Sequence, residues 1–273
     1  MPDPIPFDDF GGTGPILHFA HPNAYPPACF EALLKPLTEN YHVIAMQQRP
    51  FWPDSKLLDI TNWQIFADDL TRFLSQQGYE QVIGVGHSLG AVATMKAAYQ
   101  HPQLFRALVL IEPVFLEPQI LDLLAQNPQI MEGQPMVQKA RKRRATWPDR
   151  RTAFDHYRAK SVFKRWPDEA LWSYVNEGLS ETGDGDLTLA FSREWEAQIY
   201  SSSPGPVWDE IPQVSQPTLA IRAAESDTLS LKAWRLWQVL QPDAAFIEIP
   251  DAGHMVPMER PYEVLRAIDD FLA

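Results

Sequence analysis

A serine lies between two glycines in the pentapeptide Gly86-His87-Ser88-Leu89-Gly90. The apolar residues before it, 81–85, are typical of a buried strand, and the small residues after it, 91–100, are typical of a helix. A serine on such a tight turn takes a strained backbone conformation that pushes its hydroxyl clear of the sheet edge. The glycines let the strand and the helix pass without a side-chain collision. The pattern therefore predicts Ser88 as a nucleophile.

A serine hydroxyl is a weak nucleophile and needs a base that is held in the correct tautomer. His254 lies on a loop between the last predicted strand and the last predicted helix, at the carboxyl edge where Ser88 is also expected. His18, His21 and His87 are expected to pack or to order loops instead of taking part in catalysis. The sequence therefore predicts His254 as the base.

The third group is expected to be a carboxylate that accepts a hydrogen bond from the imidazole. Asp227 follows a predicted strand and lies on a loop at the same edge, so it is the predicted acid. Its alternative role is to cap the helix that begins near Leu229. Two rivals remain. Glu112 ends the strand after the nucleophile and is the alternative acid, and Glu225 lies two residues before Asp227.

Alternating strands and helices must position these groups, and this alternation is typical of a parallel sheet wrapped by helices. The predicted strands are apolar at consecutive positions, as expected when both faces of a sheet are buried. Predicted strands cover residues 15–20, 41–46, 81–85, 108–111, 218–221 and 245–249, and predicted helices cover 29–40, 60–78, 91–100, 229–240 and 261–272.

The alternation is interrupted between residues 114 and 206, where strand signals vanish and large aromatic residues become frequent. Helix starts are expected at 148–149 and 167–169, and a flexible break at 181–186. We expect one α/β domain, made of residues 1–113 and 207–273, with a helical insertion at 114–206.

The order Ser88, Asp227, His254, the strand-turn-helix around the serine and the closing segment 253–261 together resemble the α/β-hydrolase superfamily, and its esterase-like members in particular. The resemblance covers nearly the whole chain. It implies a mostly parallel central sheet with helices on both faces, and it implies that the 114–206 insertion is a helical cap over the active site. A serine at the turn argues against the branches that use an aspartate there, the haloalkane dehalogenases and epoxide hydrolases.

The resemblance also implies an oxyanion hole. One donor would be the backbone N–H of Leu89, and the second would come from the loop after the first strand, with Asn23 expected and Ala24 as the fallback. Many relatives have His-Gly-x-Pro in this loop, whereas Pro22 has no N–H to donate. A second departure is Gln47-Gln48-Arg49-Pro50, where relatives often have Asp-x-Arg-Gly.

These features predict a serine esterase that cleaves a small or medium, partly apolar ester through an acyl-enzyme. The expected pocket residues are His87, Phe51, Trp52 and Phe115. A C–C bond hydrolase, lactonase, amidase or thioesterase could use the same three residues. A non-catalytic ligand receptor on the same fold is the alternative from another functional class.

Composition restricts the partners and the compartment. The 273 residues carry a net charge of −12, which argues against nucleic acid and anionic membranes as partners, and the basic run 141–144 is expected to be a solvated helix face. Cys29 is the single cysteine, and the chain lacks a signal-like or membrane-spanning run, so a cytoplasmic protein is expected. No metal or cofactor motif is recognised, so no metal and no cofactor are expected. A small-molecule ester is the expected partner, and a homodimer is compatible with the sequence.

Overall fold

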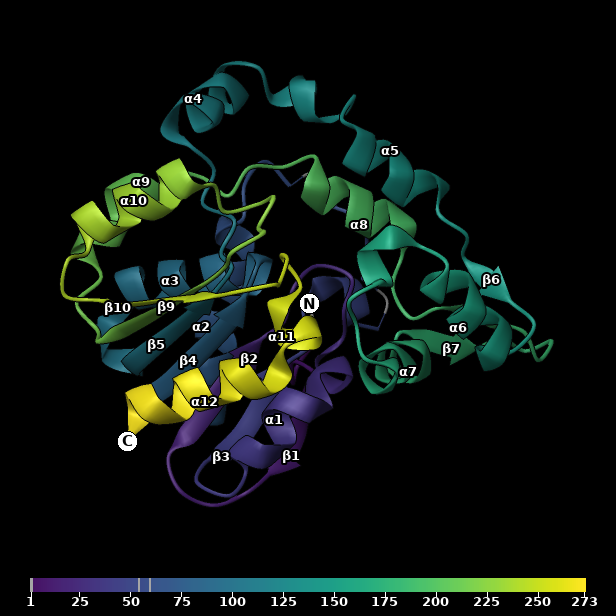
Figure 1. Ribbon diagram of the computed structural model, residues 1–273, viewed down its shortest axis with the longest axis horizontal. Helices are drawn as coiled ribbons and strands as arrows, with labels where there is room; N and C mark the ends of the chain where they lie inside the picture. The colour runs from purple at the N-terminus through teal and green to yellow at the C-terminus, as the bar shows by residue number, and fades with distance from the viewer. Residues whose placement is uncertain (1, 54, 59) are drawn as a thin grey trace.

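A seven-stranded sheet forms the centre of the computed structural model, which describes residues 2–53, 55–58 and 60–273 (Figure 1). The strand order is β1-β3-β2-β4-β5-β9-β10, with β1 antiparallel to β3 and every other pair parallel. The strands are β1 (Phe7–Gly11), β2 (Ile16–Ala20), β3 (His42–Met46), β4 (Val82–His87), β5 (Phe105–Ile111), β9 (Thr218–Ala223) and β10 (Ala245–Ile249). The predicted mostly parallel sheet is confirmed. The sequence does not predict β1, because this edge strand contains two aspartates and is only partly buried.

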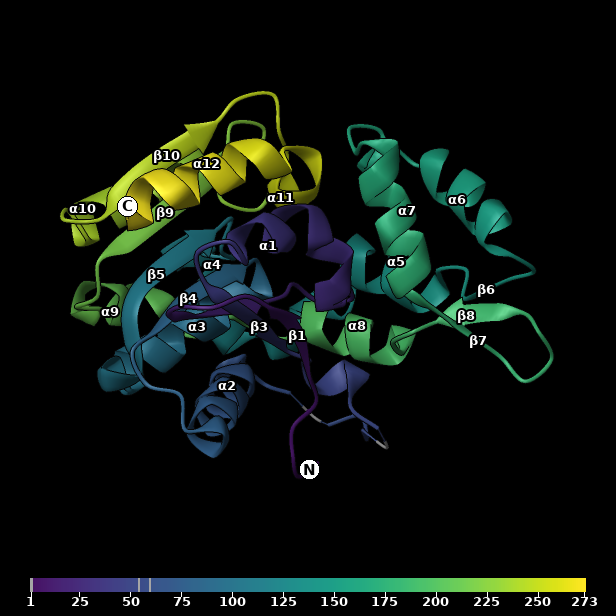
Figure 2. The same ribbon diagram turned by 90° about the horizontal axis from the view of Figure 1, so that it is seen from below.

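Helices cover both faces of this sheet, as Figure 2 shows for α1 and α12 on one side and α2 and α3 on the other. The helices of the central domain are α1 (Glu31–Leu37), α2 (Gln64–Gln77), α3 (Leu89–Gln100), α9 (Val207–Glu210), α10 (Leu231–Leu240), α11 (Val256–Glu259) and α12 (Pro261–Leu272). Neighbouring strand residues point to opposite faces. In β4, Val82 therefore joins the core beneath α2 and α3, whereas Ile83 joins the core beneath α1 and α12.

The 114–206 insertion forms an arch around the upper and right sides of the sheet in Figure 1. Its helices are α4 (Pro118–Gln126), α5 (Pro135–Lys142), α6 (Arg150–Arg158), α7 (Asp168–Glu177) and α8 (Arg193–Tyr200). It also holds a small antiparallel sheet of β6 (Thr146–Trp147), β8 (Leu187–Leu189) and β7 (Leu179–Glu181). The insertion is mostly helical, and the sequence does not predict this small sheet, because strands of two or three residues are too short to give a recognisable pattern.

The expected flexible break at 181–186 is an ordered turn between β7 and β8, where the N–H of Thr182 donates to the carbonyl of Asp186 at 2.7 Å. The basic run 141–144 is not a uniformly solvated face either. Arg143 is largely buried, and its guanidinium donates to both carboxylate oxygens of Glu196 and to the hydroxyl of Tyr174. This buried ion pair connects the end of α5 to α8 and α7.

Most of the large aromatic residues of the insertion form its own packed core. The ring of Tyr174 contacts the rings of Tyr157, Phe163 and Trp166, and it lies 4.9 Å from the ring of Tyr25, which belongs to the central domain. Aromatic pairs at such separations add to the free energy gained by burial alone. The aromatic cluster therefore holds the insertion against the loop that follows β2. Among the described residues, no helix has the length and apolar character needed to cross a membrane.

Candidate active site

Ser88 lies on the turn between β4 and α3, with φ 56° and ψ −119°. A positive φ is uncommon for a residue other than glycine and signals local backbone strain. The turn is held by a hydrogen bond of 3.0 Å from the N–H of Ser88 to the carbonyl of Ile111 in β5. This is the strained conformation that the pentapeptide pattern predicts.

The two glycines beside Ser88 have different neighbours. A Cβ at Gly86 would lie 2.6 Å from Cα of Ala91, so this glycine lets α3 cross the end of its own strand. A Cβ at Gly90 would lie 2.0 Å from the carbonyl oxygen of Ala20 and 2.7 Å from that of His21. Gly90 therefore lets the first turn of α3 approach the end of β2, which brings Leu89 close to the loop that contains Asn23.

The imidazole of His254 accepts a hydrogen bond from the hydroxyl of Ser88, with Nε2 at 2.9 Å from Oγ. It lies on the loop between β10 and α11, and the backbone on both sides of its ring is anchored. The N–H of Gly253 donates to Glu259 at 2.9 Å, and the ring of His87 donates from Nε2 to the carbonyl of His254 at 2.9 Å. The structure thus brings together the predicted nucleophile and the predicted base.

Glu112 is the carboxylate beside His254. Its Oε2 lies 3.1 Å from Nδ1 of the imidazole, and its side chain is fully buried. The N–H of Ala223 donates to Oε1 and the hydroxyl of Ser226 donates to Oε2, both at 2.6 Å. A carboxylate that faces Nδ1 keeps the proton on that nitrogen, which leaves Nε2 free to accept from Ser88.

The prediction that Asp227 holds His254 is contradicted by this geometry. Asp227 is exposed, and its carboxylate accepts the hydroxyl of Thr228 at 3.3 Å. It does not cap the next helix either, because Ser230 is the N-cap of α10. Glu112, the alternative acid, occupies the position beside Nδ1, and the loop after β9 contributes the hydroxyl of Ser226 to it. The sequence feature that indicated Glu112 was its position as a charged residue directly after the wholly apolar end of β5.

A cavity of about 660 Å³ opens above Ser88 and His254. Leu89 and Asn23 also line it. The N–H of Leu89 belongs to the first turn of α3, where a helix offers no acceptor of its own. The side chain of Asn23 is held by a 3.2 Å hydrogen bond from Nδ2 to the carbonyl of Glu196 in α8. The two expected oxyanion donors therefore lie at the start of α3 and on the loop after β2, and both line the cavity over the serine. Their role stays a prediction.

The two segments that differ from the pattern of many relatives, residues 21–24 and 47–50, are joined by buried hydrogen bonds. The N–H of Gln48 donates to Nε2 of His21 at 2.9 Å, and Nε2 of Gln48 donates to the carbonyl of His21 at 2.6 Å. His21 in turn donates from Nδ1 to the carbonyl of Pro22 at 2.9 Å. Burial lowers the pKa of His21 to about 4, so the ring is neutral and keeps this pattern at neutral pH. These hydrogen bonds fix the loop that leads to Asn23.

The remaining predicted histidines are structural. Nε2 of His18 accepts the N–H of Met46 at 3.1 Å, and burial lowers its pKa to about 3. Burial likewise lowers the pKa of His87, and the neighbouring His254 adds to that effect. Neutral imidazoles accept or donate one hydrogen bond per nitrogen, so these rings act as fixed connectors between strands and loops.

The four predicted pocket residues do not line the cavity. Phe115 packs against Trp208 and Trp237, and His87 is fully buried. Phe51 contacts the rings of His21 and Phe191, and the indole of Trp52 donates to the carbonyl of Gln47. His87 is the last residue of β4, and Phe51, Trp52 and Phe115 lie on the stretches after β3 and β5, but these side chains pack among other protein groups and do not line the cavity. The apolar lining comes instead from Tyr25, Trp63, Val114, Leu116, Met131, Met136, Val162, Ile199 and Met255.

Five charged side chains also line the cavity: Lys164, Arg165, Glu225, Asp227 and Glu259. Arg165, from the insertion, pairs with Glu225 of the loop after β9 and lies 3.9 Å from the carboxylate of Glu259. The positive charge of the Arg165 guanidinium therefore already faces two carboxylates of the central domain. Among the residues that the structure describes, no group of three or more His, Cys, Asp or Glu could hold a metal ion.

Comparison with known proteins gives consistent matches. A family model described as an alpha/beta hydrolase fold matches residues 11–261. The chain is 27% identical over 265 residues to the 2-(acetamidomethylene)succinate hydrolase of Mesorhizobium japonicum, which covers 96% of this chain and 89% of the relative. A crystal structure of E-2-(acetamidomethylene)succinate hydrolase superposes with a TM-score of 0.79 at 25% identity, over 97% of this chain and 94% of the other. The thioesterase domain from the curacin biosynthetic pathway shares the fold, with a TM-score of 0.73 at 15% identity, over 98% and 94%.

Proposed function

The chain belongs to the α/β-hydrolase fold family, and we propose that it is a serine hydrolase which cleaves a carboxylic ester through an acyl-enzyme intermediate. The family and the relatives described above support hydrolase activity. The ester and the serine nucleophile are the proposal. The observation that carries it is the continuous chain of hydrogen bonds from Ser88 through His254 to Glu112.

In the first half of the proposed reaction, Oγ of Ser88 attacks the substrate carbonyl while Nε2 of His254 takes the hydroxyl proton. The imidazole becomes positively charged, and the buried carboxylate of Glu112 stabilises that charge through the hydrogen bond at Nδ1. The N–H of Ala223, the hydroxyl of Ser226 and Nδ1 of His254 hold the carboxylate of Glu112 in a fixed orientation.

The tetrahedral intermediate carries a negative charge on the former carbonyl oxygen. The N–H groups of Leu89 and Asn23 would donate to this oxygen, and the N-terminus of α3 adds a favourable dipole. Loss of one such donor typically costs about 2.7–4 kcal/mol of the barrier. The close contact at Gly90 supports this assignment, since it brings the first turn of α3 close to the end of β2, after which Asn23 follows.

Collapse of the intermediate breaks the ester bond, and His254 returns its proton to the departing alkoxide. The acyl group is then bonded to Ser88. A water molecule attacks it as His254 takes the proton again, which releases the carboxylic acid and restores the serine hydroxyl. Each proton that leaves a nucleophile thus passes through Nε2 of one histidine.

The substrate of the named relative is a succinate derivative and so a dicarboxylate. The cavity of this chain favours a different substrate. Arg165 already faces Glu225 and Glu259, and the charged lining holds three acidic and two basic side chains. An anionic substrate would have to displace these pairs and lose their attraction. The charge pattern and the apolar walls support a neutral, partly apolar ester.

A fluorophosphonate probe tests the proposal, because it labels an activated serine covalently. We expect the wild-type protein to be labelled on the peptide that contains Ser88, and Ser88→Ala to be unlabelled and inactive on p-nitrophenyl butyrate. Labelling elsewhere, or full hydrolysis by Ser88→Ala, would refute the proposal. A parallel panel of lactones and thioesters ranks the acyl substrates, since the same attack serves all of them.

A further inference from the structure

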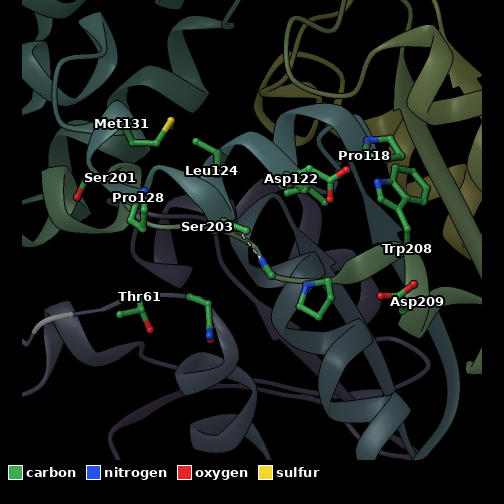
Figure 3. Close-up of a pocket in the computed structure, with 15 residues that line it drawn as sticks. Thr61, Pro118, Asp122, Leu124, Pro128, Met131, Ser201, Ser203, Trp208 and Asp209 are labelled. Carbon is green, nitrogen blue, oxygen red and sulfur yellow. Dashed lines mark hydrogen bonds between the residues drawn. The ribbon is translucent and has the colours of Figure 1, made fainter.

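A second cavity, of about 460 Å³, lies beneath α4 and next to the cavity over Ser88. Figure 3 shows Met131, Leu124 and Trp208 on one side of it and Thr61 on the opposite side. Its lining comes from three segments: the start of α2, the stretch from α4 to Met131, and the return to the central domain.

The two cavities adjoin along three stretches of chain. Met131 lines both of them. Leu116 lines the cavity over Ser88, and Pro118, two residues later, lines the second cavity. Pro204 and Gly205 divide in the same way, with the proline on the Ser88 side. The second cavity therefore adjoins the active-site cavity, with Met131 at the boundary between them.

The wall between the cavities is the segment 201–205, and its backbone is pinned to the central domain. The N–H of Trp63 donates to the carbonyl of Ser203 at 3.0 Å, and the N–H of Ser203 donates to the carbonyl of Thr61 at 3.4 Å. The indole of Trp63 also donates to the hydroxyl of Ser202 at 2.9 Å. Met131 lines both cavities, and its flexible thioether can change conformation more easily than this hydrogen-bonded wall.

The position of the second cavity relates it to the acyl side of the substrate. The lining residues include no member of the loops 225–228 and 253–259, which surround His254. The leaving alcohol must lie beside His254, because that imidazole protonates it. The acyl group of a bound ester would then lie on the other side of Ser88, where Trp63, Ser202 and Pro204 line the cavity.

The chemistry of the lining restricts what can enter. Leu121, Leu124 and Trp208 supply apolar surface, and the charged side chains there, Asp122 and Asp209, are both acidic. A chain that ends in a carboxylate would meet like charges. An uncharged aliphatic chain would bury apolar surface without that cost.

We propose that the cavity beneath α4 is an acyl-chain chamber, which takes the distal part of an uncharged, medium-length aliphatic acyl group that passes Met131. This inference rests on the proposed function. The proximal acyl carbons would lie in the cavity over Ser88, and the chain beyond them would lie beneath α4. The enzyme would then prefer medium-chain over acetyl esters.

The test compares kcat/KM for p-nitrophenyl esters of acetate, butyrate, hexanoate and octanoate, which share one leaving group. We expect the wild-type octanoate-to-acetate ratio to exceed one. Met131→Trp should lower that ratio about tenfold or more, because it blocks the passage to several methylenes. Ile130→Trp is the matched control, since Ile130 is exposed and lines neither cavity. It should keep the wild-type ratio.

Leu124→Ala provides a second variant in the opposite direction. It enlarges the chamber and should raise the ratio of decanoate to hexanoate turnover. Equal ratios in Met131→Trp, Ile130→Trp and the wild type, each with normal Ser88-dependent hydrolysis, would overturn the chamber and leave the proposed function intact. So would a chain-length preference that appears only in a series of alkyl acetates. Ester hydrolysis that persists in Ser88→Ala would count against the proposed function itself.

Discussion

The hydroxyl of Ser226 donates to Oε2 of Glu112 at 2.6 Å, and this is the oxygen that faces Nδ1 of His254. Ser226 stands on the loop after β9, and Glu112 stands at the end of β5. The two strands are neighbours in the sheet, so their carboxyl ends meet at one edge. One strand supplies the acid and the other supplies a donor that orients it.

The identity of the acid gives the first prediction. Glu112→Gln should lower kcat on p-nitrophenyl butyrate by about 10³–10⁴, because an amide leaves His254 in the wrong tautomer. Asp227→Asn should stay within about threefold of the wild type, because Asp227 is exposed and does not face the imidazole. Steady-state kinetics of both variants decide this. An inactive Asp227→Asn beside an active Glu112→Gln would reverse the assignment.

Ser226 is predicted to be a positioning residue. Ser226→Ala removes one donor from a buried carboxylate and one acceptor from the N–H of Leu229, which donates to Ser226 at 2.9 Å. We expect kcat to fall about tenfold with little change in KM, since a hydrogen bond to a charged group contributes roughly 1.5–3 kcal/mol. Ser226→Thr should restore most of the rate. A change in KM alone, or a failure of threonine to rescue, would argue for a merely structural role.

The close approach of α3 to β2 makes Gly90 intolerant of a side chain. The added Cβ in Gly90→Ala would meet the backbone carbonyls of Ala20 and His21, which cannot move aside cheaply. We expect a loss of about 1–3 kcal/mol in the free energy of unfolding, together with a large loss of activity. Gly133→Ala is the control, because a Cβ there has no neighbour within 4 Å. If Gly90→Ala were as stable and active as Gly133→Ala, the predicted role of this contact would be wrong.

Much of the sheet could be predicted because its strands are apolar at consecutive positions. β10 and α12 have the predicted bounds, and β2 and β3 differ from them by one residue. Ser88 could be predicted because Gly86 and Gly90 flank it at a distance of two residues on a strand-to-helix turn, and His254 because it follows Gly253 on the loop after β10. These features depend only on neighbouring residues, so a single sequence is enough to predict them.

The acid could not be chosen from local pattern. Glu112 and Asp227 both follow strands that end at the same edge, and only the path of each loop decides which carboxylate reaches Nδ1. The prediction of the pocket residues was wrong for a related reason. Phe115 and Trp52 follow strands that end at the carboxyl edge of the sheet, but their side chains turn into the core. Part of the cavity lining comes from α8, from the stretch before α5 and from Trp63 before α2, which are distant in sequence from the strand ends.

The buried histidines predict how stability depends on pH. The pKa of His18 is about 3 in the folded protein and about 6.5 in the unfolded chain. Between these values the unfolded chain binds more protons, so the free energy of unfolding falls as the pH drops from 6.5 towards 4. His18→Gln keeps an acceptor for Met46 without titrating. It should reduce the slope by up to about 1.4 kcal/mol per pH unit.

Urea unfolding of the wild type and His18→Gln at several pH values between 4 and 7 measures both slopes. His21 and His87 should leave a residual slope in the variant, because burial lowers their pKa values as well. Identical slopes in the two proteins would mean that His18 does not titrate with the unfolding transition.

The central claim is that Ser88, activated by His254 and Glu112, becomes acylated during turnover. Rapid acid quench of the wild-type protein with p-nitrophenyl octanoate, followed by peptide mass mapping, tests it most directly. The account predicts an octanoyl adduct on the peptide that contains Ser88, with no adduct in Glu112→Gln on the same timescale. Steady turnover with no acyl adduct, or with the adduct on another residue, would contradict it.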